Sequence, residues 1–358
     1  MRFPEFTEEW VNVSLKDVAD FQKERISSGL LDESTYISTE NILQNFQGVQ
    51  SAISIPANTN VVAYKKNDIL LSNIRPYLKK VWFSDKIGGC SADVFVLRSK
   101  TCEPEFLYNV IASDKFINYV MSGVKGVKMP RGDKNQMESF SFSIPAVAEQ
   151  RKISQLFQLL DERIATQNKI IEKLQSLIKG LRVCCMQRVY GNNVYLSEIA
   201  QIYQPQTISS TELTEDGFLV YGANGIIGKY KDYNHETEQI CITCRGNTCG
   251  MVNYTKPMSW ITGNAMVINT DKYQDKVCKR YLYHYLSAYN FNSIISGSGQ
   301  PQIVRTPLEK LKITLPTISE QKQKAIIFDK IQDKIDINHK VLNLYIGQKQ
   351  YLLRQMFI

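Results

Sequence analysis

The sequence predicts a mixed α/β (α+β) protein in which two globular domains are separated by a pair of long antiparallel coiled-coil helices. Two observations lead to this fold class. From Leu160 to Cys185, apolar residues recur at alternating steps of four and three, the heptad spacing of a helix that packs against another helix. A second stretch of this kind closes the chain and matches the first at an offset of 171 positions, which indicates an internal duplication with a pseudo-twofold repeat. The matched pairs include Pro145 and Pro316, Glu149 and Glu320, Gln150 and Gln321, Arg151 and Lys322, Phe157 and Phe328, Ile164 and Ile335, Lys169 and Lys340, and Leu181 and Leu352.

The duplication divides the chain into four segments. We predict a first globular domain over residues 1–142 and a first spacer helix over residues 143–190. A second globular domain is predicted over residues 191–313 and a second spacer helix over residues 314–358. A chain of 358 residues is long enough for two domains, because single cores usually stop growing before that length.

Short apolar runs between polar turns predict the elements of the first domain. The second domain repeats this plan, since Gly126 and Pro130 match Gly297 and Pro301 at the same offset of 171. The predicted elements are strands over residues 68–72, 80–83 and 92–97, one helix from Pro104 to Val120, a turn over residues 122–134, and a strand over residues 139–144.

Each spacer helix carries a seam of apolar residues through which we expect it to pack on the other helix. A helix over residues 149–187 would be ~55 Å long at ~1.5 Å per residue, too long to bury its seam inside a small domain. Its natural partner is therefore its own copy. Gln167 and Asn338 are polar positions near the two midpoints, and we predict that they meet and fix the antiparallel register. The predicted seam residues are Leu160, Ile164, Gln167, Ile171, Leu174, Ile178, Leu181, Ile331, Ile335, Asn338, Leu342, Tyr345 and Leu352.

The composition is that of an ordinary globular protein with basic helices. Hydrophobic residues make up 43% of the chain, and no apolar run approaches the ~20 residues that span a bilayer. The net charge is +8; residues 143–190 hold 8 basic and 4 acidic side chains, whereas residues 1–142 hold 17 of each. A basic surface favours a polyanion or an acidic partner, and it also solvates a long amphipathic helix. We expect a cytoplasmic protein with reduced thiols, since no signal peptide opens the chain and eight cysteines form no dense framework.

The sequence contains no known constellation of catalytic residues. His235, His284 and His339 have no carboxylate or cysteine at the spacing of a triad or a metal site. The glycine-rich stretch 222–230 has Tyr230 where a phosphate-binding loop needs Ser or Thr. The sequence therefore predicts no catalytic residue.

The cysteines of the second domain raise the question of a zinc site. Cys241 and Cys244 have the CxxC spacing of a zinc half-site, and Cys249 follows. However, Cys241 and Cys244 fall in a predicted strand, where odd separations point to opposite faces. We interpret them as buried structural thiols and predict no metal.

Basic and amide side chains gather in pairs of loops in both domains, as a DNA-binding surface requires. Lys and Arg neutralise phosphates, while Arg on guanine and Asn or Gln on adenine read base edges in the major groove. The alternative is an ordinary polar surface, because surface loops are rich in such side chains. The candidates are Arg75, Tyr77, Lys79, Lys80, Lys125, Lys128, Arg131 and Lys134 in the first domain, and Tyr221, Asn224, Lys229, Arg245, Asn247, Gln300, Gln302 and Arg305 in the second.

The order of domain, helix, domain and matching helix resembles the specificity (S) subunit of type I restriction-modification systems. Both helices open with Pro-x-x-x-Glu-Gln followed by Arg or Lys, at residues 145–151 and 316–322. The opening residues 2–6, Arg-Phe-Pro-Glu-Phe, and the stretch 221–228 support the resemblance. It covers essentially the whole chain, and both copies carry the helix motif.

The resemblance implies a non-catalytic subunit with two target recognition domains. Each domain would read one half of a bipartite, asymmetric DNA target, and the helix pair would set the gap between the halves. The implied partners are double-stranded DNA, two methylation (M) subunits that use S-adenosylmethionine, and, in the full complex, two motor-nuclease (R) subunits that use ATP and Mg. No cofactor and no membrane are expected on this chain itself. The alternative is a coiled-coil adaptor or scaffold without DNA specificity.

Overall fold

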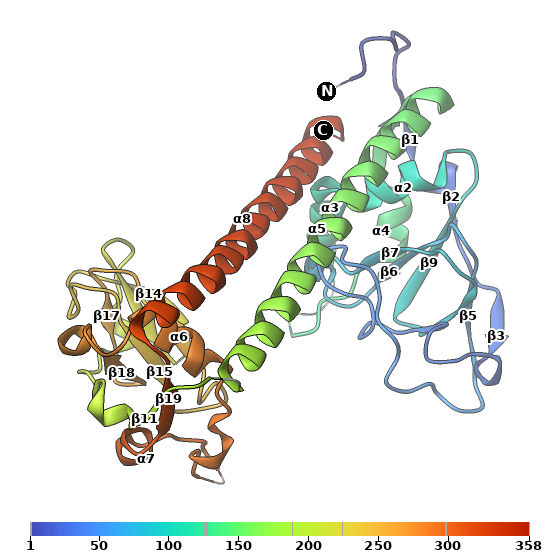
Figure 1. Ribbon diagram of the computed structural model, residues 1–358. Coiled ribbons are helices and arrows are strands. Elements are labelled where there is room, and N and C mark those ends of the chain that lie inside the picture. The colour runs from blue at the N-terminus through green and yellow to red at the C-terminus, as the bar shows by residue number, and fades with distance from the viewer. Residues whose placement is uncertain are drawn as a thin grey trace. The chain divides into compact units, whose positions relative to one another are not determined.

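A computed structural model describes residues 2–124, 126, 128–187, 189–223, 225–297 and 299–357. The chain forms two compact units: unit 1 consists of Met1–Gln167 and Val341–Ile358, and unit 2 consists of Asn168–Lys340. Each unit contains one globular part together with a part of each long helix (Figure 1). The four segment boundaries drawn from the sequence stay a prediction.

Unit 1 contains two small four-stranded sheets, a two-stranded pair and short helices. Its strands are β1 (Val11–Ser14), β2 (Ala19–Phe21), β3 (Arg25–Ser27), β4 (Tyr36–Ile37), β5 (Asn60–Tyr64), β6 (Ile69–Ser72), β7 (Val81–Phe83), β8 (Gly88–Cys90), β9 (Val94–Ser99) and β10 (Ser141–Ile144). Its helices are α1 (Leu15–Val18), α2 (Pro104–Ile111), α3 (Asp114–Ser122), α4 (Lys134–Glu138) and the first part of α5 (Val147–Gln187), with 3-10 turns η1 (Ser28–Leu30) and η2 (Pro76–Leu78). The sheet orders are β2-β9-β6-β7 and β3-β5-β8-β4, and β1 pairs with β10. The strands predicted at 68–72, 80–83, 92–97 and 139–144 are thus present as β6, β7, β9 and β10.

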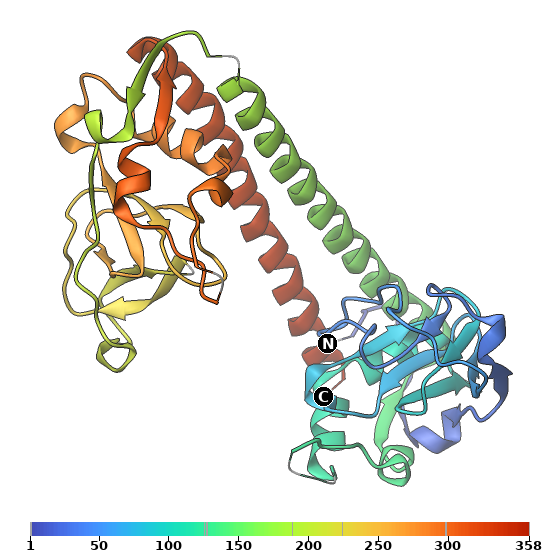
Figure 2. The ribbon, with the colours of Figure 1, turned by 90° about the horizontal axis from the view of Figure 1, so that it is seen from below.

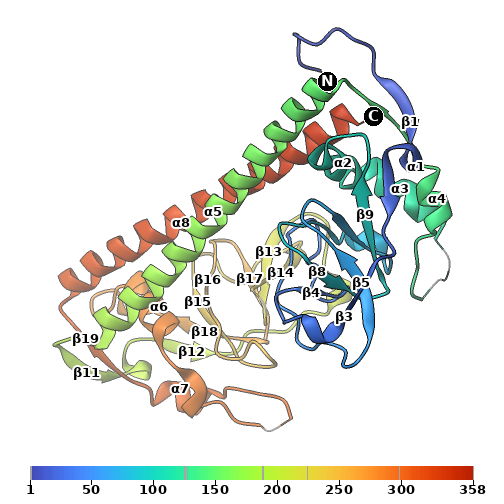
Figure 3. The same cartoon turned by 90° about the vertical axis from the view of Figure 1, so that its right-hand side faces the viewer.

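Unit 2 repeats much of this plan. Its strands are β11 (Asn192–Tyr195), β12 (Gln201–Tyr203), β13 (Phe218–Gly222), β14 (Gly225–Tyr230), β15 (Ile240–Thr243), β16 (Val252–Tyr254), β17 (Trp260–Ile261), β18 (Ala265–Asn269) and β19 (Lys312–Leu315). Its helices are α6 (Lys279–Ala288), α7 (Arg305–Glu309) and the first part of α8 (Ile318–Met356), with 3-10 turns η3 (Leu196–Glu198), η4 (Ser210–Glu212), η5 (Asp271–Tyr273) and η6 (Phe291–Ser293). The sheet orders are β12-β18-β15-β16 and β14-β13-β17. Figure 2 shows the pair β11 and β19 side by side, with β19 leading into α8, and Figure 3 shows α6 beside β15 and β16.

The prediction of one continuous helix from Pro104 to Val120 is wrong, because the structure has two helices there. Helix α2 ends at Ile111, and α3 begins at Asp114. The Ser113 hydroxyl accepts a hydrogen bond from the Phe116 N–H at 3.2 Å, so Ser113 caps a new helix. The apolar periodicity continues from α2 to α3 because both helices pack on the same core. In the sequence, Ser113 was the residue that could have indicated the start of a second helix.

A glutamine explains why the Pro-x-x-x-Glu-Gln motif occurs at the start of both long helices. Gln150 is buried; its Nε2 donates to the Pro145 carbonyl at 2.8 Å, and its Oε1 accepts from the N–H of Glu103, the residue that caps α2, at 2.9 Å. In unit 2, Gln321 makes the same bonds to Pro316 at 2.9 Å and to Cys278, the cap of α6, at 2.8 Å. Each glutamine therefore satisfies an otherwise unpaired group at a helix N-terminus and fixes the long helix to its own domain.

Within each unit, the two long helices meet in reverse order, as the duplication predicts. In unit 1, the Phe157 ring of α5 stacks on Phe357 at 6.3 Å, and Lys349 Nζ of α8 lies 2.6 Å from Asp161 Oδ1. In unit 2, Ile178 of α5 packs in one cluster with Phe328 of α8. Every predicted seam residue is buried or half-buried. Gln167 and Asn338 belong to different units, so their meeting stays a prediction.

A buried histidine joins α6 to both long helices in unit 2. His284 Nε2 lies 2.9 Å from Asp329 Oδ1 of α8, and Arg182 Nε of α5 donates to His284 Nδ1 at 3.1 Å. Burial lowers the pKa of His284 below its usual value, although Asp329 acts in the opposite direction. A neutral ring can donate to the aspartate and accept from the arginine at the same time, which fits both contacts.

Candidate nucleic-acid interface

Two loops of unit 1 are held together by backbone hydrogen bonds. The first loop, residues 73–80, follows β6, and the second is the glycine-proline turn before α4. The N–H of Arg75 donates to the Pro130 carbonyl at 2.8 Å, and the N–H of Gly132 donates to the Asn73 carbonyl at 3.0 Å. The sequence placed DNA-binding candidates in both loops, and the structure brings the loops into contact.

Unit 2 contains the same arrangement at the same offset of 171. The N–H of Gly246 donates to the Pro301 carbonyl at 3.0 Å, and the N–H of Ile303 donates to the Cys244 carbonyl at 3.0 Å. We call this arrangement the loop clamp: residues 73–75 with 130–132 in unit 1, and residues 244–246 with 301–303 in unit 2. Its recurrence shows that the duplication includes these loops as well as the helices.

One residue pair stands at the centre of each loop clamp. Ile74 and Arg131 form an isolated antiparallel bridge in unit 1, and Arg245 and Gln302 form the equivalent bridge in unit 2. The backbone is therefore the same in both units while the side chains differ.

Left-handed backbone explains the glycines that match between the two halves. Gly126 and Gly297 have φ of 90° and 93°, a region that favours glycine. A Cβ at Gly297 would lie 2.5 Å from the Gln300 carbonyl oxygen, too close for any side chain. Gly246 has φ of 81°, whereas Arg75 at the equivalent position has φ of 51° despite its side chain. The loop clamp of unit 1 thus holds an exposed arginine in a strained conformation.

Most basic candidates of unit 1 already have partners. Lys79 Nζ lies 2.6 Å from Asp114, and Arg131 Nη1 lies 3.0 Å from Asp93. Lys134 pairs with Glu138 at 3.4 Å, and Lys80 Nζ donates to the Thr39 carbonyl at 2.6 Å. Each of these four side chains is therefore held in a defined position by a neighbouring carboxylate or carbonyl group.

The remaining candidates of unit 1 are open to solvent. Arg75, Tyr77 and Lys128 are exposed, and neither Arg75 nor Lys128 has an ion pair within the described part of the chain. Lys125 lies outside the described residues. Arg75 and Lys128 are therefore the cations of this surface best placed to meet phosphates.

The unit 2 candidates divide in a similar way. Arg245, Asn247, Gln300, Gln302 and Arg305 are exposed. Arg305 Nε is held by Glu309 at 2.7 Å and Lys229 by Asp216 at 3.2 Å. Asn224 lies outside the described residues.

Tyr221 must be removed from the candidates for DNA contact. Only 5% of its surface is exposed, because it packs in the small core formed with Cys241, Ile261 and Val267. Its hydroxyl accepts a hydrogen bond from the Lys256 N–H at 3.2 Å. The sequence showed a tyrosine beside a glycine-rich turn, and only the packing of β13 against β15 and β18 places that tyrosine inside.

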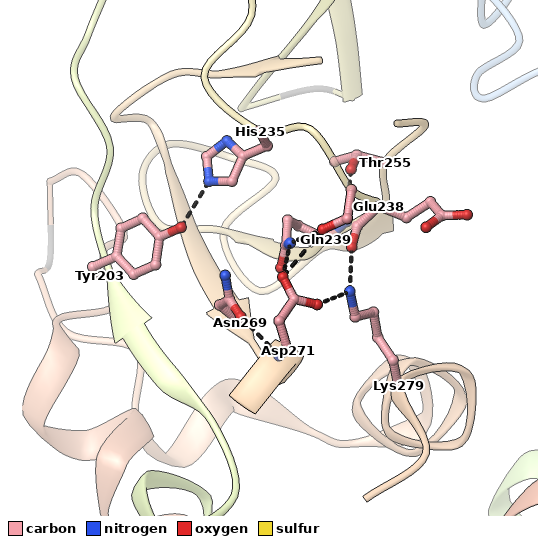
Figure 4. Close-up of polar contacts among 9 residues, drawn as sticks. Tyr203, His235, Glu238, Gln239, Thr255, Asn269, Asp271 and Lys279 are labelled. Carbon is pink, nitrogen blue, oxygen red and sulfur yellow. Dashed lines mark hydrogen bonds and ion pairs between the residues drawn. The ribbon is translucent and has the colours of Figure 1, made fainter. Parts of the chain in front are cut away.

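A polar cluster in unit 2 contains a contact between a tyrosine and a buried histidine (Figure 4). The Tyr203 hydroxyl lies 2.8 Å from His235 Nε2, and His235 Nδ1 lies 2.6 Å from Asn234 Oδ1. Burial raises the pKa of Tyr203 and lowers the pKa of His235, so both rings are neutral near pH 7. The contact ties the loop that carries His235 to β12.

Asp271 organises the other half of this cluster (Figure 4). Its Oδ1 lies 2.5 Å from Lys279 Nζ, and its Oδ2 accepts from Gln239 Nε2 at 2.9 Å. Burial by itself raises the pKa of this carboxyl, but the hydrogen bonds from Lys279 and Gln239 lower it overall. Since Lys279 opens α6, the cluster fixes the start of that helix against the strand that Gln239 precedes.

The cysteines lie as the strand argument predicted. Cys241 packs in the core cluster with Val267, whereas Cys244 packs in the other core cluster with Ile242. Burial raises the pKa of Cys241 to about 12, so this thiol stays protonated. Among the residues that the structure describes, no group of three or more His, Cys, Asp or Glu could hold a metal ion, and no helix is long and apolar enough to cross a membrane.

A comparison with protein families decides what kind of chain this is. The family described as "Type I restriction modification DNA specificity domain" matches the sequence twice, at residues 7–176 and 192–344. This chain belongs to that family. The two matches fall on the two copies of the duplication, so each half of this specificity chain is one family domain.

Individual relatives agree with the family. The EcoprrI specificity subunit of Escherichia coli is 31% identical over 147 residues, which is 40% of this chain and 36% of that protein. The MjaVIII specificity subunit of Methanocaldococcus jannaschii is 24% identical over 93% of this chain and 88% of that protein. Among solved structures, the S subunit of a type I restriction-modification system from M. genitalium has the same fold, with a TM-score of 0.67, 16% identity, and coverage of 98% of this chain and 96% of that one.

Proposed function

We propose that this specificity chain reads a bipartite, asymmetric DNA target, one half with each unit. The loop clamp carries the proposal. Its backbone hydrogen bonds recur at an offset of 171, but the bridged side chains are Ile74 and Arg131 in one unit and Arg245 and Gln302 in the other. Equal backbones with unequal side chains would present the same loops to DNA and read different bases.

The chain would act as the recognition subunit and leave the chemistry to partners. We propose that two M subunits, which use S-adenosylmethionine, dock on the long helices, and that two R subunits with ATP and Mg complete the nuclease. The excess of basic charge on the helices supports docking there. Large apolar side chains exposed on the helices would be buried by such partners, and they include Leu159, Leu344 and Tyr351 in unit 1 and Leu177, Ile326, Ile327 and Ile337 in unit 2. A cytoplasmic location, where DNA and these partners are, stays a prediction.

Exchanging one recognition domain tests this function. In this experiment, residues 1–142 would be replaced with the corresponding domain of another specificity chain. The hybrid would be co-expressed with the M subunit, and methyl-adenine would be located by sequencing the DNA. One half of the methylated target is expected to change and the other half to stay as in the wild type, because each unit has its own core and its own loop clamp.

The outcomes separate the proposal from its alternative. The reciprocal hybrid, with residues 191–313 replaced, is the matched control and is expected to change only the other half. If both halves change in either hybrid, independent reading by the two units is refuted. A wild-type complex that shows no sequence preference would instead favour the coiled-coil adaptor.

The length of the helix pair is expected to set the gap between the half-targets. Removing one heptad from each helix, residues 164–170 and 335–341, shortens both by ~10 Å. At ~3.4 Å per base pair, the gap in the methylated target is expected to shrink by about three base pairs. Removing the heptad from one helix alone is the control, because it misaligns the seam and is expected to abolish methylation. An active double deletion with an unchanged gap would contradict the proposal.

A further inference from the structure

The bridged pair at the centre of each loop clamp has a specific geometry. In unit 2, the hydrogen bonds from Gly246 to Pro301 and from Ile303 to Cys244 flank the bridge between Arg245 and Gln302. Arg245 and Gln302 are therefore a non-hydrogen-bonded antiparallel pair. Residues opposed in this way point to the same face of the ribbon and have the closest side chains, with Cβ atoms about 4.5–5.5 Å apart.

Gln302 is also part of a second bridge, which makes this loop a short ribbon. Its N–H donates to the Ser296 carbonyl at 2.8 Å, and the Ser296 N–H donates back to the Gln302 carbonyl at 2.9 Å. Gln302 is thus fixed from both sides while its side chain is exposed. The major groove of DNA is wide enough to admit a two-stranded ribbon of this kind.

Arg245 differs from the other arginines that the structure describes in unit 2. Arg305 is held by Glu309 at 2.7 Å, Arg280 lies 3.7 Å from Asp329, and Arg182 is bonded to His284. Arg245 is exposed, and it has no ion pair within the described residues. Its guanidinium N–H groups are therefore open to a ligand. The backbone bridge places Arg245 beside Gln302, which is also exposed.

We propose that Arg245 and Gln302 are the base-reading pair of the second half-target, with Arg245 on a guanine and Gln302 on an adenine of neighbouring base pairs. Arginine matches the two acceptors of guanine and glutamine matches the acceptor and donor of adenine. The two Cβ atoms lie about 4.5–5.5 Å apart, so two flexible side chains can reach base pairs that are separated by one ~3.4 Å step. This assignment rests on the proposed function and deepens it.

The same positions in unit 1 carry a different pair. Ile74 can contact only an apolar group such as the methyl of thymine, and Arg131, oriented by Asp93 at 3.0 Å, can read a guanine. The bridged pair is therefore the point of the repeat at which the two half-targets diverge.

The test measures base preference position by position. The chain is co-expressed with the M subunit, and methylation rates are measured on a library in which every base pair of the target is varied. Arg245→Ala is expected to reduce discrimination at one base pair of the second half about 10- to 100-fold and to leave the first half unchanged. Gln302→Ala is expected to do the same at the neighbouring base pair. Lys272→Ala, an exposed change outside both loops, is the control and is expected to alter neither half.

A change of preference provides a second, independent readout. Arg245→Gln is expected to move the preference at the first of these base pairs from guanine to adenine, which keeps the test valid if Arg245→Ala lowers overall binding. Unchanged preferences in Arg245→Ala and Arg245→Gln, in complexes that still methylate, would overturn the assignment. So would a uniform loss over all base pairs, the sign of a phosphate contact. If the wild-type complex has no sequence preference at all, the proposed function itself fails.

Discussion

Replacing Phe328 with alanine is expected to lower the free energy of unfolding of unit 2 by about 3–5 kcal/mol. Only 1% of this side chain is exposed. Its ring lies 5.1 Å from the His284 ring, and it packs in one cluster with Ile178 of the other long helix. The change would leave a cavity where α6, α5 and α8 meet, and it would remove one side of the packing that keeps the neutral His284 ring in place.

The measurement has to report on one unit at a time, because a chain with two units need not unfold in one step. Hydrogen exchange in residues 168–340 as a function of urea gives the stability of unit 2. The neighbouring Ile327, which is 55% exposed, supplies the matched control, and Ile327→Ala is expected to change stability by about 0.5 kcal/mol or less. The equivalent Phe157→Ala is expected to act in the same way on unit 1. If Phe328→Ala and Ile327→Ala had equal effects, the helix junction would not be a packed core.

Replacing Arg2 with alanine is expected to destabilise unit 1 by about 3 kcal/mol. The Glu149 carboxylate at the start of α5 is only 1% exposed, and Arg2 binds both of its oxygens, at 3.1 and 3.0 Å. Without the arginine, among the side chains that the structure describes, the buried Glu149 carboxylate would keep only the hydrogen bond that Trp10 Nε1–H donates at 3.2 Å. The value is at the low end of the range for buried pairs because Arg2 itself is 32% exposed.

Two further variants make this prediction specific. Lys152→Ala removes the neighbouring pair with Glu5, whose partners are both exposed, and is expected to cost at most about 1 kcal/mol. Adding Glu149→Gln to Arg2→Ala removes the unpaired charge and is expected to restore most of the lost stability in urea unfolding. An Arg2→Ala variant as stable as Lys152→Ala, or a double variant no better than the single one, would show that Glu149 is not a buried charge that needs Arg2.

The candidate DNA-binding residues could be predicted by type and by loop, but not by their partners. Lys79, Arg131 and Arg305 looked like free cations in the sequence, yet each is held by a carboxylate. Two of these partners, Asp93 and Asp114, are far from the cations in sequence, and spacing cannot show such contacts. The same limit applies to the helix seam. Lys349 of α8 can be buried because Asp161 of α5, 2.6 Å away, pairs with its charge. Heptad spacing alone gave no reason to expect a lysine at this position.

The sequence by itself determined the duplication, the offset of 171, the two long helices and the family, since these depend on periodicity and on motifs repeated along the chain. Only the tertiary structure decided which loops form the loop clamp, that Tyr221 is buried, and that the Gln of each Pro-x-x-x-Glu-Gln motif bonds to the N-cap residue of a second helix. These features are contacts between segments tens of residues apart. Periodicity reports which face of an element is apolar, whereas a hydrogen bond between distant segments exists only once packing has brought them together.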